Sequence, residues 1–436
     1  MSVIAPFISE APVTAPQRPL RIAVLVDLQL SADAGGHVKC WERLATAACA
    51  FPEILDLTLY FMGPRRELKT LDDNVRFVTE PPVFSTARLP FLAHVPDHTD
   101  LAPWHPRIAG ALARHDVIHT TDAYFAYART ALRVSRRHAV PVVNSVHTDT
   151  PQYARIFTTQ TVERLLGTGP AARLLIDRLG VPGFAERHML RRLAAHQRAC
   201  AAVLVSRPDQ LAAAMELSGG RAALLRRGVD RDFFTPAKRD RAWLAANFGI
   251  PPERTVVLFA GRVNHSKNVM LLADAVADLV ARGLPLHLVC AGAGEQRAAV
   301  GARLGGHATC PGNVPPATLA RLYASADLFA FPSPVEECAN VVLEALASGL
   351  PILVARESGM GRIVVDGTTG FALSTSRSFA WSRFIDLLAT DHARRAKMAR
   401  QARLYAERRL PSWADVLRED LLPPWQRAAA HARSMA

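Results

Sequence analysis

The chain has 436 residues, of which half are hydrophobic and 21% are charged, a balance typical of globular proteins. Disordered, collagen-like and small disulfide-framework proteins are therefore excluded, and the length predicts two or three domains. Lysine and arginine number 52 against 39 acidic residues, and the net charge of +13 favours anionic partners such as phosphates, nucleic acid or acidic lipid.

The first twenty residues and the six cysteines indicate in which cellular compartment the protein is expected. Residues 1–20 contain several prolines and lack the basic and apolar regions of a signal peptide, so we expect a loose extension before the fold begins. No apolar run of the sequence approaches the length of a membrane span. The cysteines show no zinc-type spacing, which favours free thiols in a reducing compartment and predicts no metal site. We therefore expect a cytoplasmic protein.

From residue 21 onward, short apolar runs alternate with amphipathic stretches. Strands are predicted at 22–26, 55–61, 75–78, 116–119, 140–146 and 201–205. A helix begins at Gly35-Gly36, and another is predicted over 124–137. Such alternation indicates a parallel sheet with helices on both faces, so residues 21–227 are predicted to form a Rossmann-like domain.

The same pattern restarts after residue 227. Strands are predicted at 256–260, 286–291, 327–331 and 352–355. Residues 228–380 are therefore predicted to form a second domain, and we expect the helices of 381–436 to pack back on the first. The predicted fold class is α/β, with two doubly wound Rossmann-like domains that face each other across a cleft.

Polar residues follow the predicted strands, where doubly wound sheets bind ligands. Arg262 and Lys267 lie in a turn between a strand and a helix start, and two fixed cations beside helix N–H groups form an anion site. The alternative is a pair of solvated residues near a helix cap. The backbone of Gly35-Gly36 can also approach a phosphate closely, although glycine pairs are common in ordinary turns.

Two glutamates flank the start of a predicted helix at Asn340-Val341. Glu336 and Glu344 are separated by seven residues. Carboxylates can accept hydrogen bonds from the vicinal hydroxyls of a ribose or a hexose, and the helix start between them can hold phosphate. A diphosphate with a sugar at each end fits this arrangement. The alternative is two surface glutamates that stabilise the helix dipole.

Taken in order, these motifs resemble the second domain of the family-4 retaining glycosyltransferases, which have the GT-B fold. The matching positions are Gly261-Arg262, Lys267-Asn268, Tyr323, Asp327, Pro332-Ser333, Glu336, Glu344, Ser348-Gly349-Leu350-Pro351 and Asp366-Gly367. In the first half, Gly35-Gly36 matches the family's glycine loop. The segment 145–153, with His147, is similar to the strand-end histidine motif of subgroups that glycosylate lipids and related acceptors. The resemblance covers about residues 21–375.

The resemblance implies a role for each matching residue. Arg262 and Lys267 would hold the donor diphosphate and stabilise its charge as it departs, without a metal or any other cofactor. Glu344 would bind the ribose, and Glu336 would bind and orient the transferred sugar. His147 would contact the donor sugar near the reacting centre and could share a proton or a hydrogen bond with the diphosphate. The alternative is a histidine at a strand end that is held as a structural group.

The resemblance further implies that Gly35, Gly36, Asn340 and Val341 contact the nucleotide sugar, which is the co-substrate. Mannose transfer from GDP-mannose is favoured, with a UDP-hexose donor close behind. Retention of configuration would follow from attack on the face of the leaving group, with the diphosphate taking the acceptor proton.

Two positions depart from the family pattern. Cys338-Ala339 stand where many relatives have Phe-Gly, and the methyl of Ala339 lies where backbone amides should approach the sugar. The turn 263–266 lacks the acidic residue that is common before the lysine. Both changes leave the cations for the diphosphate in place, while the first leaves the identity of the sugar open.

The acceptor is expected to be a lipid, a glycan or a small molecule. A basic stretch with Arg187, Arg191, Arg192 and Arg198 is a candidate for docking on an anionic membrane surface at the inner face, and an ordinary solvated helix is the alternative. The evenly spread charge argues against nucleic acid as a partner. Two rival functions remain: a GT-B sugar-nucleotide epimerase, and a non-catalytic module that binds a sugar nucleotide or nucleic acid.

Overall fold

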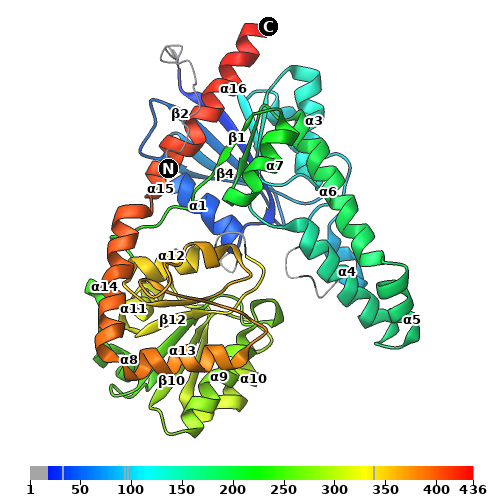
Figure 1. Ribbon diagram of the computed structural model, residues 1–436. Helices are drawn as coiled ribbons and strands as arrows, with labels where there is room; N and C mark the ends of the chain where they lie inside the picture. The colour runs from blue at the N-terminus through cyan, green and yellow to red at the C-terminus, as the bar shows by residue number, and fades with distance from the viewer. Residues whose placement is uncertain (1–17, 32–33, 93–94, 96–97, 337–338, 436) are drawn as a thin grey trace.

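A computed structural model describes residues 18–31, 34–92, 95, 98–336 and 339–435 (Figure 1). Most of the expected extension 1–20 lies outside these residues. The described chain forms two α/β units, one above the other in Figure 1, and each has a mostly parallel sheet covered by helices. The predicted class of two doubly wound halves is confirmed.

The first sheet has eight strands in the order β3-β4-β2-β1-β5-β6-β7-β8. All neighbouring strands run parallel except β3 and β4, which are antiparallel. The strands are β1 Leu20–Gln29, β2 Leu55–Met62, β3 Glu67–Asp72, β4 Val75–Glu80, β5 Val117–Thr120, β6 Val142–Val146, β7 Ala202–Val205 and β8 Ala222–Leu224. The edge strands β3 and β8 were not predicted, because β3 is largely exposed and β8 has only three residues.

Helices cover both faces of this sheet. They are α1 Gly36–Ala48, α2 Pro106–Leu112, α3 Ala126–His138 and α7 Pro208–Ser218, with short turns η1 Thr86–Arg88 and η2 Pro90–Leu92. A further group of helices lies between β6 and β7 and projects sideways from the body (Figure 1). It comprises α4 Thr150–Leu166, α5 Pro170–Arg173, the π-helical η3 Leu174–Arg178 and α6 Val181–Ala199.

The second sheet has six strands in the order β11-β10-β9-β12-β13-β14. They are β9 Thr255–Ala260, β10 Leu286–Ala291, β11 Ala308–Gly312, β12 Leu328–Phe331, β13 Ile352–Ala355 and β14 Gly370–Leu373. The surrounding helices are α8 Arg241–Phe248, α9 Val269–Ala281, α10 Arg297–Leu304, α11 Pro316–Ser325, α12 Asn340–Ala347, α13 Ser378–Thr390 and α14 His392–Arg409. Strands β11 and β14 at the two edges are additional to the prediction.

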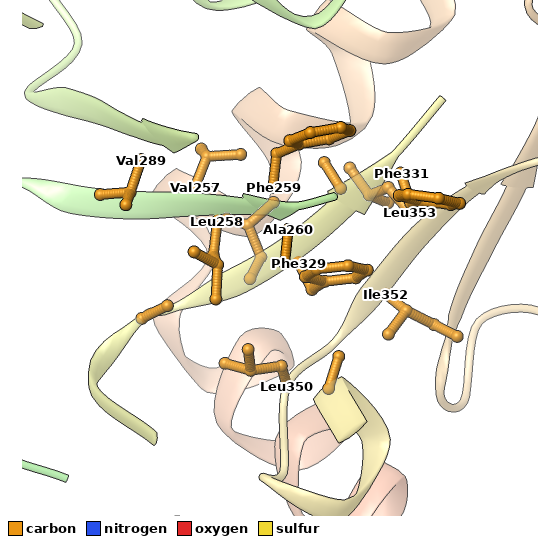
Figure 2. Close-up of a cluster of buried hydrophobic side chains, with 14 of the residues drawn as sticks. Val257, Leu258, Phe259, Ala260, Val289, Phe329, Phe331, Leu350, Ile352 and Leu353 are labelled. Carbon is orange, nitrogen blue, oxygen red and sulfur yellow. The ribbon is translucent and has the colours of Figure 1, made fainter. Parts of the chain in front are cut away.

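The core of the second half is built on its central strands (Figure 2). Every residue of β9, β12 and β13 is buried, as expected for a parallel sheet with both faces covered. Phe331 stacks on Phe259 and Phe329, with ring centroids 5.7 Å and 6.1 Å apart. This rigid centre holds the carboxyl ends of β9 and β12, and thus the loops that follow them.

The end of the chain divides between the two halves. Helices α13 and α14 pack on the second half, where Trp381 and Ile385 join its core. This corrects the expectation that all residues from 381 onward pack on the first domain, because the apolar faces of α13 and α14 fit α9 and α12. Only α15 Trp413–Asp415, η8 Val416–Leu421 and α16 Leu422–Met435 return to the first half, as Figure 1 shows.

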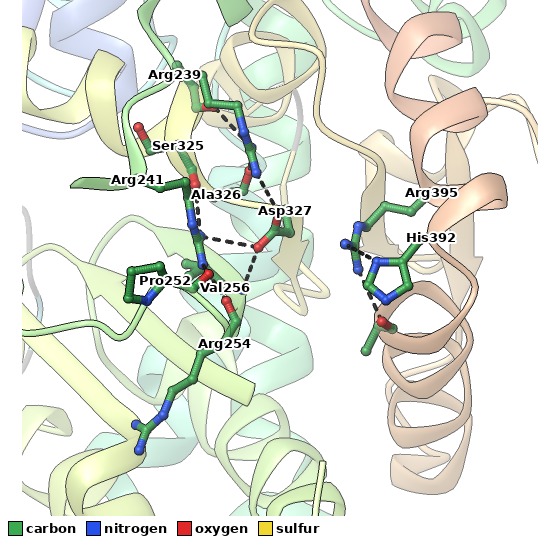
Figure 3. A network of polar contacts seen from close by, with 12 residues as sticks. Arg239, Arg241, Pro252, Arg254, Val256, Ser325, Ala326, Asp327, His392 and Arg395 are labelled. Atoms are coloured by element: carbon green, nitrogen blue, oxygen red, sulfur yellow. Dashed lines mark hydrogen bonds and ion pairs between the residues drawn. The ribbon is translucent and has the colours of Figure 1, made fainter. Parts of the chain in front are cut away.

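A polar network ties the start of the second half to its sheet (Figure 3). The Asp327 carboxylate accepts hydrogen bonds from Arg239 at 2.8 Å, from Arg241 at 3.3 Å and from the backbone N–H of Val256 at 2.8 Å. The Asp327 side chain is only 8% exposed. The carboxylate therefore fixes Arg239, just before α8, and Arg241, the first residue of α8, against the beginning of β9.

We predict that Asp327→Asn lowers the free energy of unfolding by about 2–3 kcal/mol, because it removes a shielded charge that two arginines share. Urea unfolding would measure the loss. Asp274→Asn is the matched control, since Asp274 pairs with Arg303 where both side chains are about half exposed, and its cost should stay below about 1 kcal/mol. Equal losses in the two variants would contradict the assignment.

Candidate functional site

A cleft of about 1440 Å³ lies between the two halves, at the carboxyl ends of β1, β6, β9 and β12. Its lining includes every residue that the sequence singled out for binding or catalysis. These are Gly35, Gly36, His147, Arg262, Lys267, Glu336, Asn340, Val341 and Glu344. Residues that lie more than 300 positions apart in the chain thus share one site.

The glycine loop of the first half faces the cation turn of the second. A Cβ built on Gly35 would lie 3.5 Å from the Arg262 guanidinium, so the two loops are nearly in contact. A Cβ on Gly36 would meet nothing within 4 Å, which leaves open space above that backbone. Asn340 Nδ2 lies 3.5 Å from the carbonyl of Gly36. The start of α12 and the start of α1 therefore meet across the cleft.

Lys267 and Glu336 form an ion pair with each other. Both side chains are mostly buried, and Ser333 Oγ donates a second hydrogen bond to Glu336 Oε1 at 3.1 Å. Asn264 caps the short turn η5 His265–Lys267 by accepting from the Lys267 backbone N–H. The cation and the carboxylate assigned to different parts of a donor thus neutralise each other in the structure.

Glu344 is paired with Arg43, a residue of α1 that the sequence analysis missed. Arg43 NH2 lies 2.7 Å from Glu344 Oε1, and the Glu344 side chain is only 3% exposed. Burial raises the pKa of the Tyr323 phenol well above its usual value, and the nearby Glu344 carboxylate adds to the rise. No local pattern marks Arg43 among the many arginines of this chain, since its partner lies in the other half.

His147 lies at the end of β6 with both ring nitrogens held by the protein. An Arg227 nitrogen lies 2.9 Å from Nδ1, and Ser145 Oγ lies 2.7 Å from Nε2. Trp41 Nε1 also approaches Nε2, at 3.3 Å. A guanidinium can only donate, so Nδ1 accepts and the neutral ring carries its proton on Nε2 toward Ser145. With a proton on Nε2, this nitrogen cannot also accept a hydrogen bond from the Trp41 indole N–H, which is the longer of the contacts.

The network continues away from the cleft to the C-terminal helix. His119 Nε2 lies 2.7 Å from Ser145 Oγ, and Trp425 Nε1 donates to His119 Nδ1 at 2.9 Å. Trp425 therefore fixes the tautomer of His119, whose Nε2–H then faces Ser145. A residue of α16 thus helps to orient the histidine in the cleft.

This environment keeps the histidines neutral. Burial, reinforced by His37 and Arg227, holds the pKa of His147 well below its usual range. Burial also lowers the pKa of His37 and of His119 to about 3. The His37 and His147 rings stack with centroids 4.5 Å apart. His147 is therefore suited to contact and orientation rather than to carrying a proton.

Two acids on the first-half wall, the buried Asp27 and the half-buried Asp122, were also missed. Asp27 accepts a hydrogen bond from Tyr127 N at 3.1 Å, and Asp122 accepts from Tyr124 N at 2.7 Å. Burial and the neighbouring Asp122 charge raise the pKa of Asp27 well above its usual value, and burial raises that of Asp122. The sequence signal was Asp27 itself, which follows the first apolar run at the mouth of the cleft.

Only part of the basic stretch that the sequence analysis considered for a membrane surface is exposed; other residues of the stretch face the cleft. Met189 and Leu193 line the cleft, and Arg192 donates a hydrogen bond to the carbonyl of Tyr124. In the first departure from the family pattern, Ala339 lies in the cleft with its N–H 3.2 Å from Met360 Sδ, whereas Cys338 is outside the described residues.

Within the described ranges, no helix combines the length and apolar composition that a membrane span requires. No group of three or more histidine, cysteine, aspartate or glutamate side chains there is arranged to hold a metal ion.

Residues 241–405 match the family model described as glycosyl transferases group 1. A D-inositol 3-phosphate glycosyltransferase from an Arthrobacter species is 30% identical over 307 residues, which cover 67% of this chain and 67% of that relative. The chain belongs to the group 1 glycosyltransferase family. A relative of the same description from a Nocardioides species is 28% identical over 349 residues, 74% of this chain and 70% of that protein.

Solved structures support the GT-B fold. HepE from Anabaena, in complex with UDP and glucose, has a TM-score of 0.64 and 16% identity, with 96% of this chain and 100% of that chain covered. Sucrose-phosphate synthase from Thermosynechococcus elongatus has a TM-score of 0.65 and 17% identity, with 96% and 98% covered. The expected GT-B architecture is thus confirmed for this member of the family.

We predict that the buried histidines make the fold acid-sensitive. The pKa of His119 is about 3 in the folded chain against about 6.5 when unfolded, so the unfolded state binds the proton first. Its stabilising contribution is complete above about pH 6.5 and falls by about 1.4 kcal/mol per pH unit as the pH drops toward the folded pKa.

Urea unfolding between pH 7 and pH 5 tests this prediction. His119→Gln should reduce the pH dependence of the unfolding free energy by about one proton. The exposed His138 provides the control His138→Gln, which should leave the slope unchanged. An unaltered slope in His119→Gln would show that His119 does not resist protonation.

Proposed function

We propose that the protein is a retaining hexosyltransferase that moves a sugar, with mannose favoured, from a nucleotide diphosphate to a lipid, glycan or small-molecule acceptor. The observation that supports this proposal is the meeting of the Gly35 loop with Arg262, beside the pairs that involve Lys267, Glu336 and Glu344. A diphosphate between two sugars needs such a set of cations and carboxylates.

The diphosphate would lie at Arg262 and Lys267, facing the open backbone of Gly36. Phosphate oxygens would replace Glu336 as the partner of Lys267, because a diphosphate carries more charge than one carboxylate. Glu336 would then be released to accept hydrogen bonds from hydroxyls of the transferred sugar. The two fixed cations would stabilise the charge that develops on the departing diphosphate, which is preorganised electrostatic catalysis.

Glu344 would bind the ribose hydroxyls, and Asn340 and Val341 would present the start of α12 to the phosphates. Arg43 already binds one Glu344 oxygen, and the Glu344 side chain is buried. Arg43 would therefore position Glu344 for the ribose.

The acceptor oxygen would attack on the face from which the diphosphate leaves, and that diphosphate would take the acceptor proton. His147 would contact the sugar near this centre and orient it. A hydrogen bond from His147 to the diphosphate requires the ring to give up Arg227 or Ser145, since these hold both nitrogens. The chemistry needs no metal in this scheme.

The choice of donor has two sources of support. The family resemblance favours GDP-mannose, whereas HepE was solved with UDP-glucose, which supports a UDP-hexose. The relatives described as D-inositol 3-phosphate glycosyltransferases support a polyol phosphate as one small-molecule acceptor to test. The cytoplasm is the proposed site of action.

Thermal shift with GDP, UDP, GDP-mannose, UDP-glucose and UDP-N-acetylglucosamine, followed by product analysis, tests the proposal. The matching nucleotide should raise the unfolding midpoint, because it binds only the folded state. Transfer with retained configuration supports the proposal. An isomerised donor without transfer would favour the epimerase, and binding without turnover of any donor would favour a non-catalytic module.

We predict that Lys267→Ala lowers turnover about a hundredfold, as expected for the loss of one charge-stabilising group. Turnover at saturating donor, measured on folded variants, gives the effect. Lys69→Ala, on the exposed strand β3, is the control and should keep full turnover. A folded Lys267→Ala enzyme with normal turnover would remove Lys267 from the diphosphate site.

We also predict that Trp425→Phe lowers turnover by about fivefold while the donor affinity is unchanged, because the loss of one hydrogen bond, about 1 kcal/mol, frees the His119–Ser145–His147 chain. Trp381→Phe removes an equivalent buried indole donor, to Ser374 O, in the second half. Trp381→Phe is therefore the control for the loss of such a donor. If Trp425→Phe retains normal turnover as the control does, the Trp425 side chain contributes to packing alone.

A further inference from the structure

The helical group of residues 150–199, here called the arm, has almost no core of its own. Helices α4 and α6 pack against each other, yet no leucine, isoleucine, valine or phenylalanine of the arm is buried. Its buried side chains are Pro151, Ala172, Pro182, His196 and Gln197. Figure 1 shows the arm projecting away from both sheets. Neither sheet therefore covers the large apolar side chains at the outer end of the arm.

The outer part of the arm, residues 163–190, concentrates exposed apolar side chains. Fifteen large hydrophobic side chains are exposed in the described part of the chain, and six of them lie in this segment. They are Leu165, Leu166, Leu174, Leu179, Phe184 and Leu190, with exposed fractions from 48% to 64%. Scattered apolar residues are ordinary on a surface, whereas such a concentration marks an interaction site.

The same arm carries a surplus of positive charge. Eight arginines and three acidic residues give residues 150–199 a net charge of +5, out of +13 for the whole chain. Seven of the arginines are exposed: Arg155, Arg164, Arg173, Arg178, Arg187, Arg191 and Arg198. Exposed leucines and exposed arginines are therefore interleaved along the arm.

We propose that the outer part of the arm docks on an anionic bilayer, with its leucines and Phe184 in the interface and its arginines on the lipid headgroups. Apolar side chains surrounded by arginines are what an interfacial helix presents to acidic lipid. A second copy of the chain is disfavoured as the occupant, because a symmetric contact would bring two arms of +5 together.

The inner side of the arm connects this docking surface to the cleft. Phe157, Val162, Ala185 and Met189 line the cleft from α4 and α6. Tyr153 Oη also donates to Val335 O at 3.2 Å, beside Glu336 in the second half. A lipid acceptor in the bilayer would therefore reach the site along the arm, a consequence that rests on the proposed sugar transfer.

Sedimentation of the full chain with lipid vesicles tests the docking independently of transfer. The protein should bind vesicles of phosphatidylcholine mixed with phosphatidylglycerol, bind phosphatidylcholine alone weakly, and dissociate at high salt. The variant Leu165→Ser/Leu179→Ser/Phe184→Ser should lower vesicle affinity at least about tenfold. Its control, Leu68→Ser/Val365→Ser/Phe379→Ser, removes similarly exposed apolar residues elsewhere and should bind as the parent does.

A second variant, Arg164→Gln/Arg173→Gln/Arg178→Gln, keeps the apolar patch and should also lose at least about tenfold in affinity and most of its salt dependence. A retained thermal shift with nucleotide shows that each variant is folded. Equal binding of variants and parent, equal binding to neutral vesicles, or a dimer that the leucine variant abolishes would each overturn the docking. Vesicle binding without transfer from any donor would instead overturn the proposed function alone.

Discussion

The two chain crossings between the halves are fixed to each other, and the shape of the cleft depends on this contact. Val229 N donates to Pro411 O at 3.0 Å, and a Cβ on Gly228 would lie only 2.7 Å from the backbone N of Trp413. Any residue with a Cβ at position 228 would clash with the Trp413 backbone, so this close contact requires glycine. Trp413 and Trp425 are buried in the core of the first half, so the second crossing is anchored there. The two halves are therefore joined through a tight contact between the crossings.

Within this frame the charged residues of the cleft are held by one another. Lys267 pairs with Glu336, Arg43 pairs with Glu344, and Arg227 bonds His147. Buried charges are costly unless they are paired, and each of these groups has a partner within the protein. A phosphate-bearing donor would replace Glu336 as the partner of Lys267. The network that holds His147 lies outside this exchange, which suits a residue that orients.

The arm differs from the rest of the chain in the exposure of its apolar side chains and in its net charge. The two sheets and the helices packed on them bury most of their large apolar side chains, whereas the arm leaves six large apolar side chains exposed and adds a charge of +5. A helix pair of this composition gains little from the fold and much from an acidic, partly apolar surface. The arm also forms one wall of the cleft. A membrane contact at its outer part and an acceptor bound at its inner side would therefore involve the same pair of helices.

The sequence by itself determined the alternation of strands and helices, because periodicity is a local property that each apolar run displays. It also placed Gly35, Arg262 and Lys267 at strand ends, since the carboxyl ends of parallel strands share one edge. It missed the edge strands, whose residues are few or exposed. Only the tertiary structure brought Arg43 to Glu344 and Trp425 to His119, residues about 300 positions apart. Such pairs leave no local pattern, because what selects them is burial against the other half of the fold.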